Sequence, residues 1–169
     1  MSDALVFGES VAGETYKHRY VVSGVIVDGE GRIAVVRVGD RYFLPGGGIE
    51  SGESEHETLI REAREECARG IVIGARLGEA VFHQYAPAYG GWTIHSVYYC
   101  ADFGPDLGAA PEPDHTLLHM SPDEARAHLF RRSDVWALTR ALESGPNPCG
   151  PPVFLAFLRA ARGAGGVFT

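Results

Sequence analysis

Three glutamates stand close together near the middle of the chain, at positions that one helical turn would bring onto the same face. They are Glu62, Glu65 and Glu66, spaced i, i+3 and i+4. Like charges at this spacing repel one another on a bare helix, so the arrangement favours a ligand that neutralises them. Hard divalent cations such as Mg²⁺ bind carboxylate oxygens together with phosphate oxygens. The three glutamates are therefore a candidate metal site for phosphate chemistry.

A run of glycines, Gly46, Gly47 and Gly48, precedes the glutamates. Glycine has no Cβ, so a glycine loop allows the backbone to approach a ligand closely. Each feature alone has a simpler explanation, because most glycine runs are turns and most charged helical segments are solvated faces. Their joint spacing favours a loop, helix and metal that together bind a diphosphate.

That spacing resembles the Nudix box: Gly, five residues, Glu, seven residues, Arg-Glu, an apolar residue, any residue, Glu-Glu, any residue, Gly and an apolar residue. The matching positions in this chain are Gly47, Glu53, Arg61, Glu62, Ala63, Glu65 and Glu66. The last two positions of the box depart from the pattern. The pattern places a glycine and an apolar residue where this chain has Ala68 and Arg69, and Gly70-Ile71 follows two residues later. We interpret this as a two-residue insertion. It predicts a helix that runs through about Arg69, with Gly70 as its left-handed cap.

The resemblance implies a metal-dependent hydrolase that uses water to cut a diphosphate bond, with Mg²⁺ as cofactor and Mn²⁺ as a substitute. It implies an α/β fold of the Nudix type, an α/β/α sandwich with a mixed β-sheet. Glu62, Glu65 and Glu66 resemble the family's metal-binding acids, with help from the backbone carbonyl of Gly46.

Glu53 resembles the family's loop acid, which braces the site or contacts a second metal, and it completes the expected catalytic set. Arg61 is expected to pair with Glu53 and hold the loop against the helix. The sequence offers two candidate positions for the general base. Glu62 is one candidate, and Glu112 or Asp114, in the proline-rich loop before an expected strand, is the other.

Residues outside the box select the substrate. Arg37 and Arg41 lie on expected strands that run toward the glycine loop, and Lys17 and Arg19 precede the first expected strand, so each is a candidate phosphate ligand. Tyr89 lies in a loop that could stack a base. The residues we favour for substrate binding are Arg37, Arg41, Gly47, Gly48 and Tyr89.

The strand that leads directly into the box resembles the MutT branch of the family, which favours a nucleoside triphosphate, an oxidised one included, hydrolysed to the monophosphate and pyrophosphate. A dinucleoside polyphosphate, ADP-ribose or a nucleotide sugar is the alternative. Two non-catalytic hypotheses compete: a Nudix-fold nucleotide sensor, and a scaffold protein whose glutamates are a solvated face. Sensors of this fold usually lose acids from the box, and this chain keeps all of them.

The glycine loop and the glutamate helix need other elements to position them. Ser54 and Glu57 form a capping box, which predicts the start of the helix. A second capping box at Ser121 and Glu124 predicts another helix start. Apolar patterning predicts strands over 20–27, 32–38, 41–44, 71–73, 76–84, 92–102 and 115–120, and helices over 122–130, 134–143 and 153–162.

The 169 residues suit a single domain, with 1–15 as a loose arm or edge strand and 145–169 as a C-terminal extension. The formal net charge of -7 argues against broad binding to nucleic acid or to an anionic membrane. The three cysteines form no CxxC pair that would hold zinc. With no signal peptide or apolar span in the sequence, we expect a cytoplasmic protein that binds a small-molecule nucleotide. A homodimer is compatible with the sequence.

Overall fold

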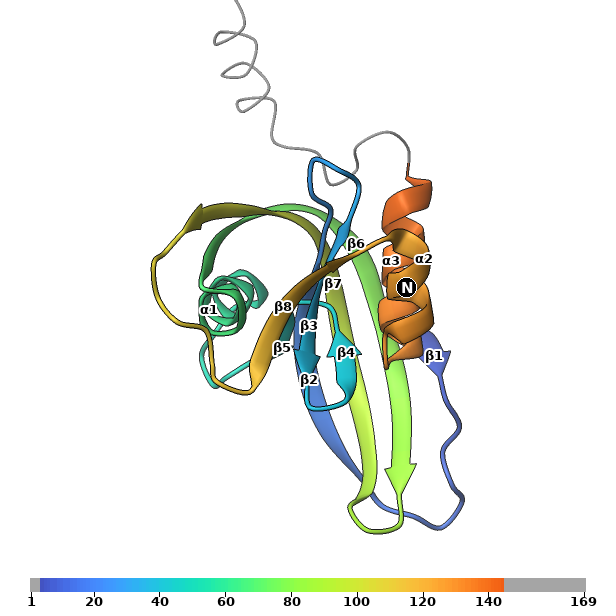
Figure 1. Ribbon diagram of the computed structural model, residues 1–169. Helices are drawn as coiled ribbons and strands as arrows, with labels where there is room; N and C mark the ends of the chain where they lie inside the picture. Colours follow the sequence, from blue (N-terminus) through green and yellow to red (C-terminus); the bar gives the residue numbers. More distant parts are fainter. Residues whose placement is uncertain (1–3, 145–169) are drawn as a thin grey trace, which may run out of the picture.

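The computed structural model describes residues 4–144, which form two β-sheets with helices on both sides (Figure 1). The larger sheet has the strand order β1-β6-β7-β2-β5: β1 (Leu5–Phe7), β6 (Arg69–Ala86), β7 (Gly90–Asp106), β2 (Tyr16–Ile26) and β5 (Gly46–Gly48). The smaller sheet has the order β4-β3-β8: β4 (Arg41–Phe43), β3 (Ile33–Val38) and β8 (His115–Met120). The helices are α1 (Glu55–Cys67), α2 (Pro122–His128) and α3 (Arg132–Glu143).

The expected α/β class with a mixed sheet is confirmed. In the larger sheet β1 pairs with β6 and β2 with β7 in parallel, whereas β6–β7 and β2–β5 are antiparallel. Helix α1 lies on one side of this sheet and α2 and α3 lie on the other (Figure 1). The helix expected over 153–162 lies outside the described residues.

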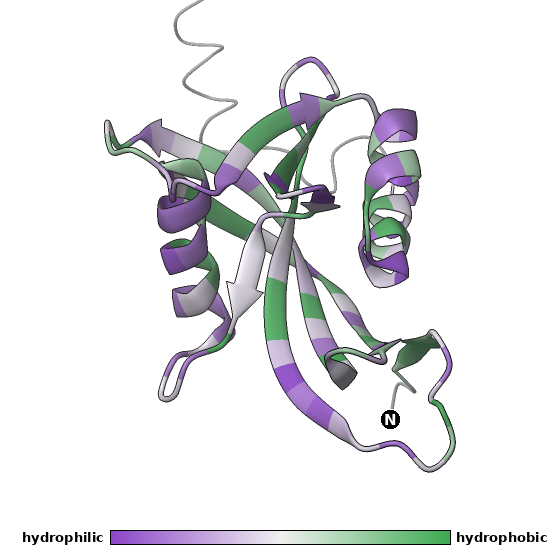
Figure 2. Ribbon diagram, turned by 60° about the horizontal axis from the view of Figure 1, so that its bottom comes forward, coloured by the Kyte–Doolittle hydropathy of each residue, from purple (hydrophilic) through white to green (hydrophobic). Residues whose placement is uncertain are grey.

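The apolar core divides along the two faces of β2. Val22 packs with Leu59 of α1 on one face, and Val25 belongs to a larger cluster that includes Leu138 of α3 on the other. Because helices cover both faces, the end of β2 nearest the glycine loop is a continuous buried run rather than an alternating one. Most of α1 is hydrophilic (Figure 2), and its buried apolar residues are Leu59, Ala63 and Cys67.

One strand was wrongly predicted as two. The segments expected at 71–73 and 76–84 belong to a single strand, β6, because β7 pairs with it along its whole length. Pairing shifts register between Ile73 and Arg76 and again between Arg76 and Gly78. A β-bulge keeps a strand continuous while bending it, so the turn-like composition around Gly74 was misleading. The other strand of this hairpin, β7, runs on to Asp106, into the stretch expected to be a loop.

The predicted end of the glutamate helix is wrong. Helix α1 ends at Cys67, and Ala68 adopts the left-handed conformation with φ 52° and ψ 33°. Its N–H bonds to the carbonyls of Ala63 and Arg64, as in a helix cap. Strand β6 starts at once with Arg69, which pairs with Asp106. The box therefore contains no insertion, and Ala68 occupies the place and the conformation of the pattern's glycine.

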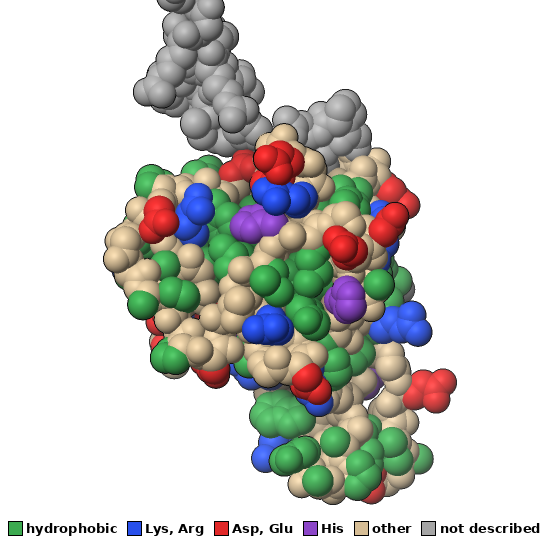
Figure 3. Space-filling model, viewed as in Figure 1, with side chains coloured by type: hydrophobic (Ala, Val, Ile, Leu, Met, Phe, Trp, Pro, Cys, Tyr) green, Lys and Arg blue, Asp and Glu red, His purple; other side chains and the backbone are tan. Residues whose placement is uncertain are grey.

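One face of the molecule carries side chains of mixed charge (Figure 3). On the face in Figure 3, basic side chains are scattered among acidic and apolar ones and do not gather into an extended patch. None of the described helices is long and apolar enough to cross a membrane.

Candidate active site

The glycine loop lies directly against the glutamate helix. The backbone N–H of Gly46 donates a hydrogen bond of 2.9 Å to Oε2 of Glu66. Gly46 has φ 142° and pairs with Ser23 of β2, and a Cβ at this position would collide with the carbonyl oxygen of Val22. Only glycine fits at this position, and its lack of a side chain allows β5 to lie this close to β2.

Gly47 leaves space for the carboxylate of Glu62. A Cβ on Gly47 would overlap the carboxylate of Glu62, which therefore lies against the loop backbone. The side chain of Glu62 is 14% exposed and that of Glu66 is 10% exposed, whereas that of Glu65 is 41% exposed. The sequence-predicted acids thus meet at the junction of β5 and α1, two of them largely buried and one open to solvent.

Arg61 links the loop to the helix, as expected from the sequence. Its Nε and Nη2 donate to the two carboxylate oxygens of Glu53 over 2.7 and 2.9 Å. Nη1 donates to Glu62 over 3.0 Å and to Glu65 over 2.9 Å, and Nη2 also reaches the carbonyl of Gly48 over 3.0 Å. A planar guanidinium with five donors can satisfy all these acceptors at once, which a lysine cannot.

Glu53 is held by more than the arginine. The hydroxyl of Thr58 and the N–H of Glu50 both donate to it. The hydrogen bonds from Arg61, Thr58 and Glu50 lower the pKa of Glu53 to about 2. Glu53 is therefore a permanent carboxylate that braces the loop.

The pKa values of Glu62 and Glu66, next to the loop, are raised, whereas that of Glu53 is lowered. Burial raises the pKa of Glu66 to about 8, against the hydrogen bond from Gly46, and the charge of Glu62 adds to the effect. Burial also raises the pKa of Glu62. Burial and the mutual repulsion of these acids therefore disfavour their charged forms, although Arg61 partly offsets this at Glu62. Their hard oxygen donors, on one helical turn, fit a divalent cation such as Mg²⁺.

The proline-rich loop brings a further acid to this place. The N–H of Glu112 donates to the carbonyl of Glu65 over 2.8 Å, and the charge of Glu112 contributes to the raised pKa of both Glu62 and Glu66. Asp114 is less well placed, because its side chain is 72% exposed. Of the two loop acids considered as a base, Glu112 lies closer to the electrostatic centre of the site.

His115 is a site residue that the sequence reasoning missed. Its Nδ1 lies 2.9 Å from Asp114 and 3.1 Å from Glu112, and its Nε2 lies 3.5 Å from Oε1 of Glu66. It was treated only as the start of an expected strand. The available signal was its position directly after two acids that were themselves candidates.

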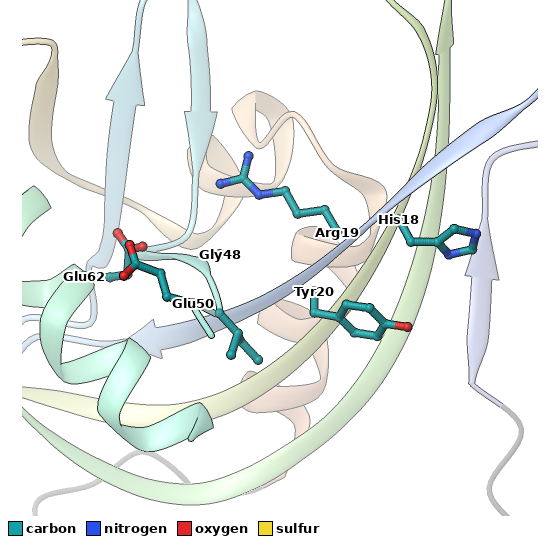
Figure 4. A pocket seen from close by; sticks show the side chains of 7 residues that line it. His18, Arg19, Tyr20, Gly48, Glu50 and Glu62 are labelled. Atoms are coloured by element: carbon teal, nitrogen blue, oxygen red, sulfur yellow. The ribbon is translucent and has the colours of Figure 1, made fainter. Parts of the chain in front are cut away.

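A cavity of about 410 Å³ opens beside the glycine loop. Its lining includes Arg19 from β2, Gly48 and Glu62. In Figure 4 the side chain of Arg19 extends over the loop, whereas His18 and Tyr20 point away on the other face of the strand. Arg19 was one of four basic candidates but was not favoured. The first strand was expected to start at residue 20, whereas β2 starts at Tyr16 and includes it.

A second cavity, of about 570 Å³, contains two of the favoured substrate residues. Arg41 lines it, with its guanidinium over the ring of Phe130 at 4.2 Å. Tyr89 lies at its rim and is 80% exposed. Arg37 is exposed on β3 and lines neither of these cavities.

Comparison with known proteins adds an independent line of evidence. The family model of the NUDIX domain matches residues 17–146. The chain is similar in structure to a NUDIX hydrolase from Nitrosomonas europaea, with a TM-score of 0.61 and 17% identity over 76% of this chain and 90% of that one. It is also similar to the MutT protein from Methanosarcina mazei Go1, with a TM-score of 0.59 and 16% identity over 80% and 98%.

A third similar structure is that of the E. coli ORF135 protein. Its TM-score is 0.54, and it is 26% identical over 88% of this chain and 96% of that one. No curated protein matches the chain.

Proposed function

The chain belongs to the Nudix family and is a pyrophosphohydrolase, and on this premise we propose that it hydrolyses a nucleoside triphosphate to the monophosphate and pyrophosphate. The reaction takes place where β5 meets α1. One observation carries the proposal: Glu66 and Glu62 both lie against the glycine loop, the first bonded to the N–H of Gly46 and the second in the space left by Gly47.

Glu62, Glu65 and Glu66 are the proposed ligands of Mg²⁺, for which Mn²⁺ can substitute. When bound, the metal polarises the diphosphate, offsets charge on the leaving group and lowers the pKa of its water. The backbone carbonyl of Gly46 stays a predicted additional ligand. The assignment is supported by two of the three carboxylates, which are largely buried and have raised pKa values, so a bound cation would favour their charged forms.

Arg61 and Glu53 serve as a brace in this proposal. The guanidinium fixes Glu62 and Glu65 relative to the carbonyl of Gly48. This holds the metal-facing carboxylates in place before substrate arrives. Arg19, which extends over the same loop (Figure 4), is the proposed ligand of a phosphate oxygen.

The general base is assigned to Glu62 or Glu112. Burial raises the pKa of Glu62, and a raised pKa makes a carboxylate a stronger base. Glu112 lies close enough that its charge contributes to the raised pKa of Glu62 and Glu66. Asp114 is a weaker candidate, because its hydrogen bond with His115 lowers its pKa. Gln substitutions at each position separate the two: the base is the residue whose loss flattens the pH dependence of kcat.

The test is a panel of nucleotides incubated with Mg²⁺ or Mn²⁺, with products identified by mass in ¹⁸O-labelled water. A nucleoside triphosphate should yield labelled monophosphate if water attacks the α-phosphorus, or labelled pyrophosphate if it attacks the β-phosphorus. Preferred turnover of a dinucleoside polyphosphate, ADP-ribose or a nucleotide sugar would replace the proposed substrate. Nucleotide binding without turnover would favour a sensor.

A further inference from the structure

The second cavity has an unusual balance of charge. Its described lining includes three arginines, Arg19, Arg41 and Arg131, and no acidic side chain. None of the three forms an ion pair with a carboxylate of residues 4–144 within 4 Å. Three arginines without an ion pair at that distance line one hollow in a chain with a net charge of -7, and the charge of Arg131 acts on Glu66 and Asp134 over a longer range. The three arginines favour an anionic ligand.

Two of these guanidinium groups lie over aromatic rings. Arg41 lies over Phe130 at 4.2 Å, and Arg131 lies over Phe43 at 4.9 Å. The two stacks join β4 to the turn between α2 and α3. Stacking occupies a face of the guanidinium, and its N–H donors lie in the plane, so they stay free to bind oxygen atoms. The cavity is therefore preorganised for phosphate rather than merely positive.

The second cavity adjoins the candidate catalytic site, because one residue lines both. Arg19 lines both this cavity and the one that contains Glu62 and Gly48. A substrate whose diphosphate lies beside the glycine loop can therefore extend past Arg19 toward Arg41 and Arg131.

We propose that the second cavity binds an additional phosphate of the substrate, which for a nucleoside triphosphate is the γ-phosphate. This inference rests on the proposed function and narrows its substrate class to nucleotides with a third phosphate. Arg41 and Arg131 are specificity residues that distinguish a triphosphate from a diphosphate of the same nucleoside. In this proposal the rings of Phe130 and Phe43 orient Arg41 and Arg131.

The variants Arg41→Gln and Arg131→Gln test the proposal. For one nucleoside, kcat/KM is measured with the triphosphate and with the diphosphate, and melting curves confirm folding. Each variant should lower kcat/KM for the triphosphate about tenfold and leave that for the diphosphate within about twofold, as expected for loss of a charged hydrogen bond. The matched control is Arg140→Gln, because Arg140 also lies over an aromatic ring, that of Trp136, but lines neither cavity. It should change neither value.

Equal losses for both nucleotides would overturn the proposal, because they would show that the arginines stack on the base. Calorimetric binding of inorganic tripolyphosphate to the metal-free protein makes the test independent of turnover. Weaker binding in the Arg41 and Arg131 variants supports the cavity assignment even if no nucleoside triphosphate is hydrolysed. Hydrolysis of the triphosphate with unchanged binding and kinetics in both variants would reject the cavity while leaving the proposed function intact.

Discussion

The N–H of Gly46 donates to Oε2 of Glu66 over 2.9 Å, and this bond joins the glycine loop to a carboxylate that is only 10% exposed. The acid is thus fixed in place before any ligand binds. Its burial raises its pKa to about 8, so the metal-free site holds a proton near neutral pH. A divalent cation would displace that proton and satisfy the crowded oxygens.

We expect metal binding to raise the melting temperature. Mg²⁺ or Mn²⁺ at about 100-fold above its dissociation constant should stabilise the fold by about 2.7 kcal/mol. Differential scanning calorimetry with and without metal measures the change. Glu65→Gln should reduce the shift, whereas Glu79→Gln, which alters an ion pair with Arg76 on β6, should not. If the melting temperature rose equally in the unsubstituted protein and in both variants, Glu65 would not be a metal ligand.

Much of the site could be predicted because its geometry is local. Glu62, Glu65 and Glu66 share one turn, so helical periodicity alone places them together. The capping box at Ser54 and Glu57 is equally local, and it is confirmed by reciprocal hydrogen bonds.

Features that depend on pairing between distant segments could not be predicted. Arg19 reaches the glycine loop because β2 extends to Tyr16 beside β7, and nothing near Arg19 in sequence indicates this. His115 meets Glu66 only because the loop over 107–114 folds back onto α1. The end of α1 was wrong for the same reason. Pairing of Arg69 with β7 stops the helix at Cys67, although Gly70 offered a better local cap.

Ala68→Gly should stabilise the protein by about 1 kcal/mol. Ala68 has φ 52°, a conformation that costs a residue with a Cβ about 1–2 kcal/mol and costs glycine little. Urea unfolding measures the difference. Arg64→Gly, within the same helix, is the control and should destabilise by about 1 kcal/mol. If Ala68→Gly also destabilised, the left-handed cap would not be the strained position.

The Glu53–Arg61 bond should make part of the stability acid-sensitive. Arg61 holds the pKa of Glu53 near 2, below its ordinary value of 4.5. A depressed pKa stabilises the fold above the unfolded-state pKa, and this contribution is lost as pH falls from about 4.5 through about 2. NMR titration of the Glu53 side-chain carboxyl carbon should give a midpoint near 2.

In Arg61→Gln that midpoint should move up toward 4.5. The activity of this variant should fall roughly 10- to 100-fold, as is typical when a residue that orients metal ligands is lost. A midpoint that did not move would show that Thr58 and Glu50, not Arg61, hold the charge of Glu53.

A buried hydrogen bond connects α3 to the start of the glycine loop. Asp134 is fully buried and accepts from the hydroxyl of Tyr98 over 2.8 Å and from the N–H of Leu44 over 3.4 Å. Tyr98→Phe leaves that carboxyl group with one partner fewer, so it should cost about 1–3 kcal/mol in chemical denaturation. Tyr99→Phe is the matched control. The hydroxyl of Tyr99 bonds to Glu55, whose side chain is 36% exposed and can bind water instead, so its loss should cost less. An equal loss of stability in the two variants would show that the hydrogen bond between Tyr98 and Asp134 contributes no more than the one between Tyr99 and Glu55.

The most direct test of the account compares Glu66→Gln with Glu57→Gln in steady-state hydrolysis. Both variants neutralise one glutamate of α1 and keep its shape. Glutamine at 66 can still accept from the N–H of Gly46, and glutamine at 57 can still serve the capping box, so melting curves should show both proteins folded.

With Mg²⁺ and the nucleotide that the panel identifies, Glu66→Gln should lower kcat by about 100-fold or more. The lost charge acts on the transition state, where one well-placed group typically contributes about 3 kcal/mol. Glu57→Gln should stay within a few-fold of the unsubstituted protein. Equal losses of activity in the two variants would contradict the account, because the glutamates would then be only the solvated face of a helix.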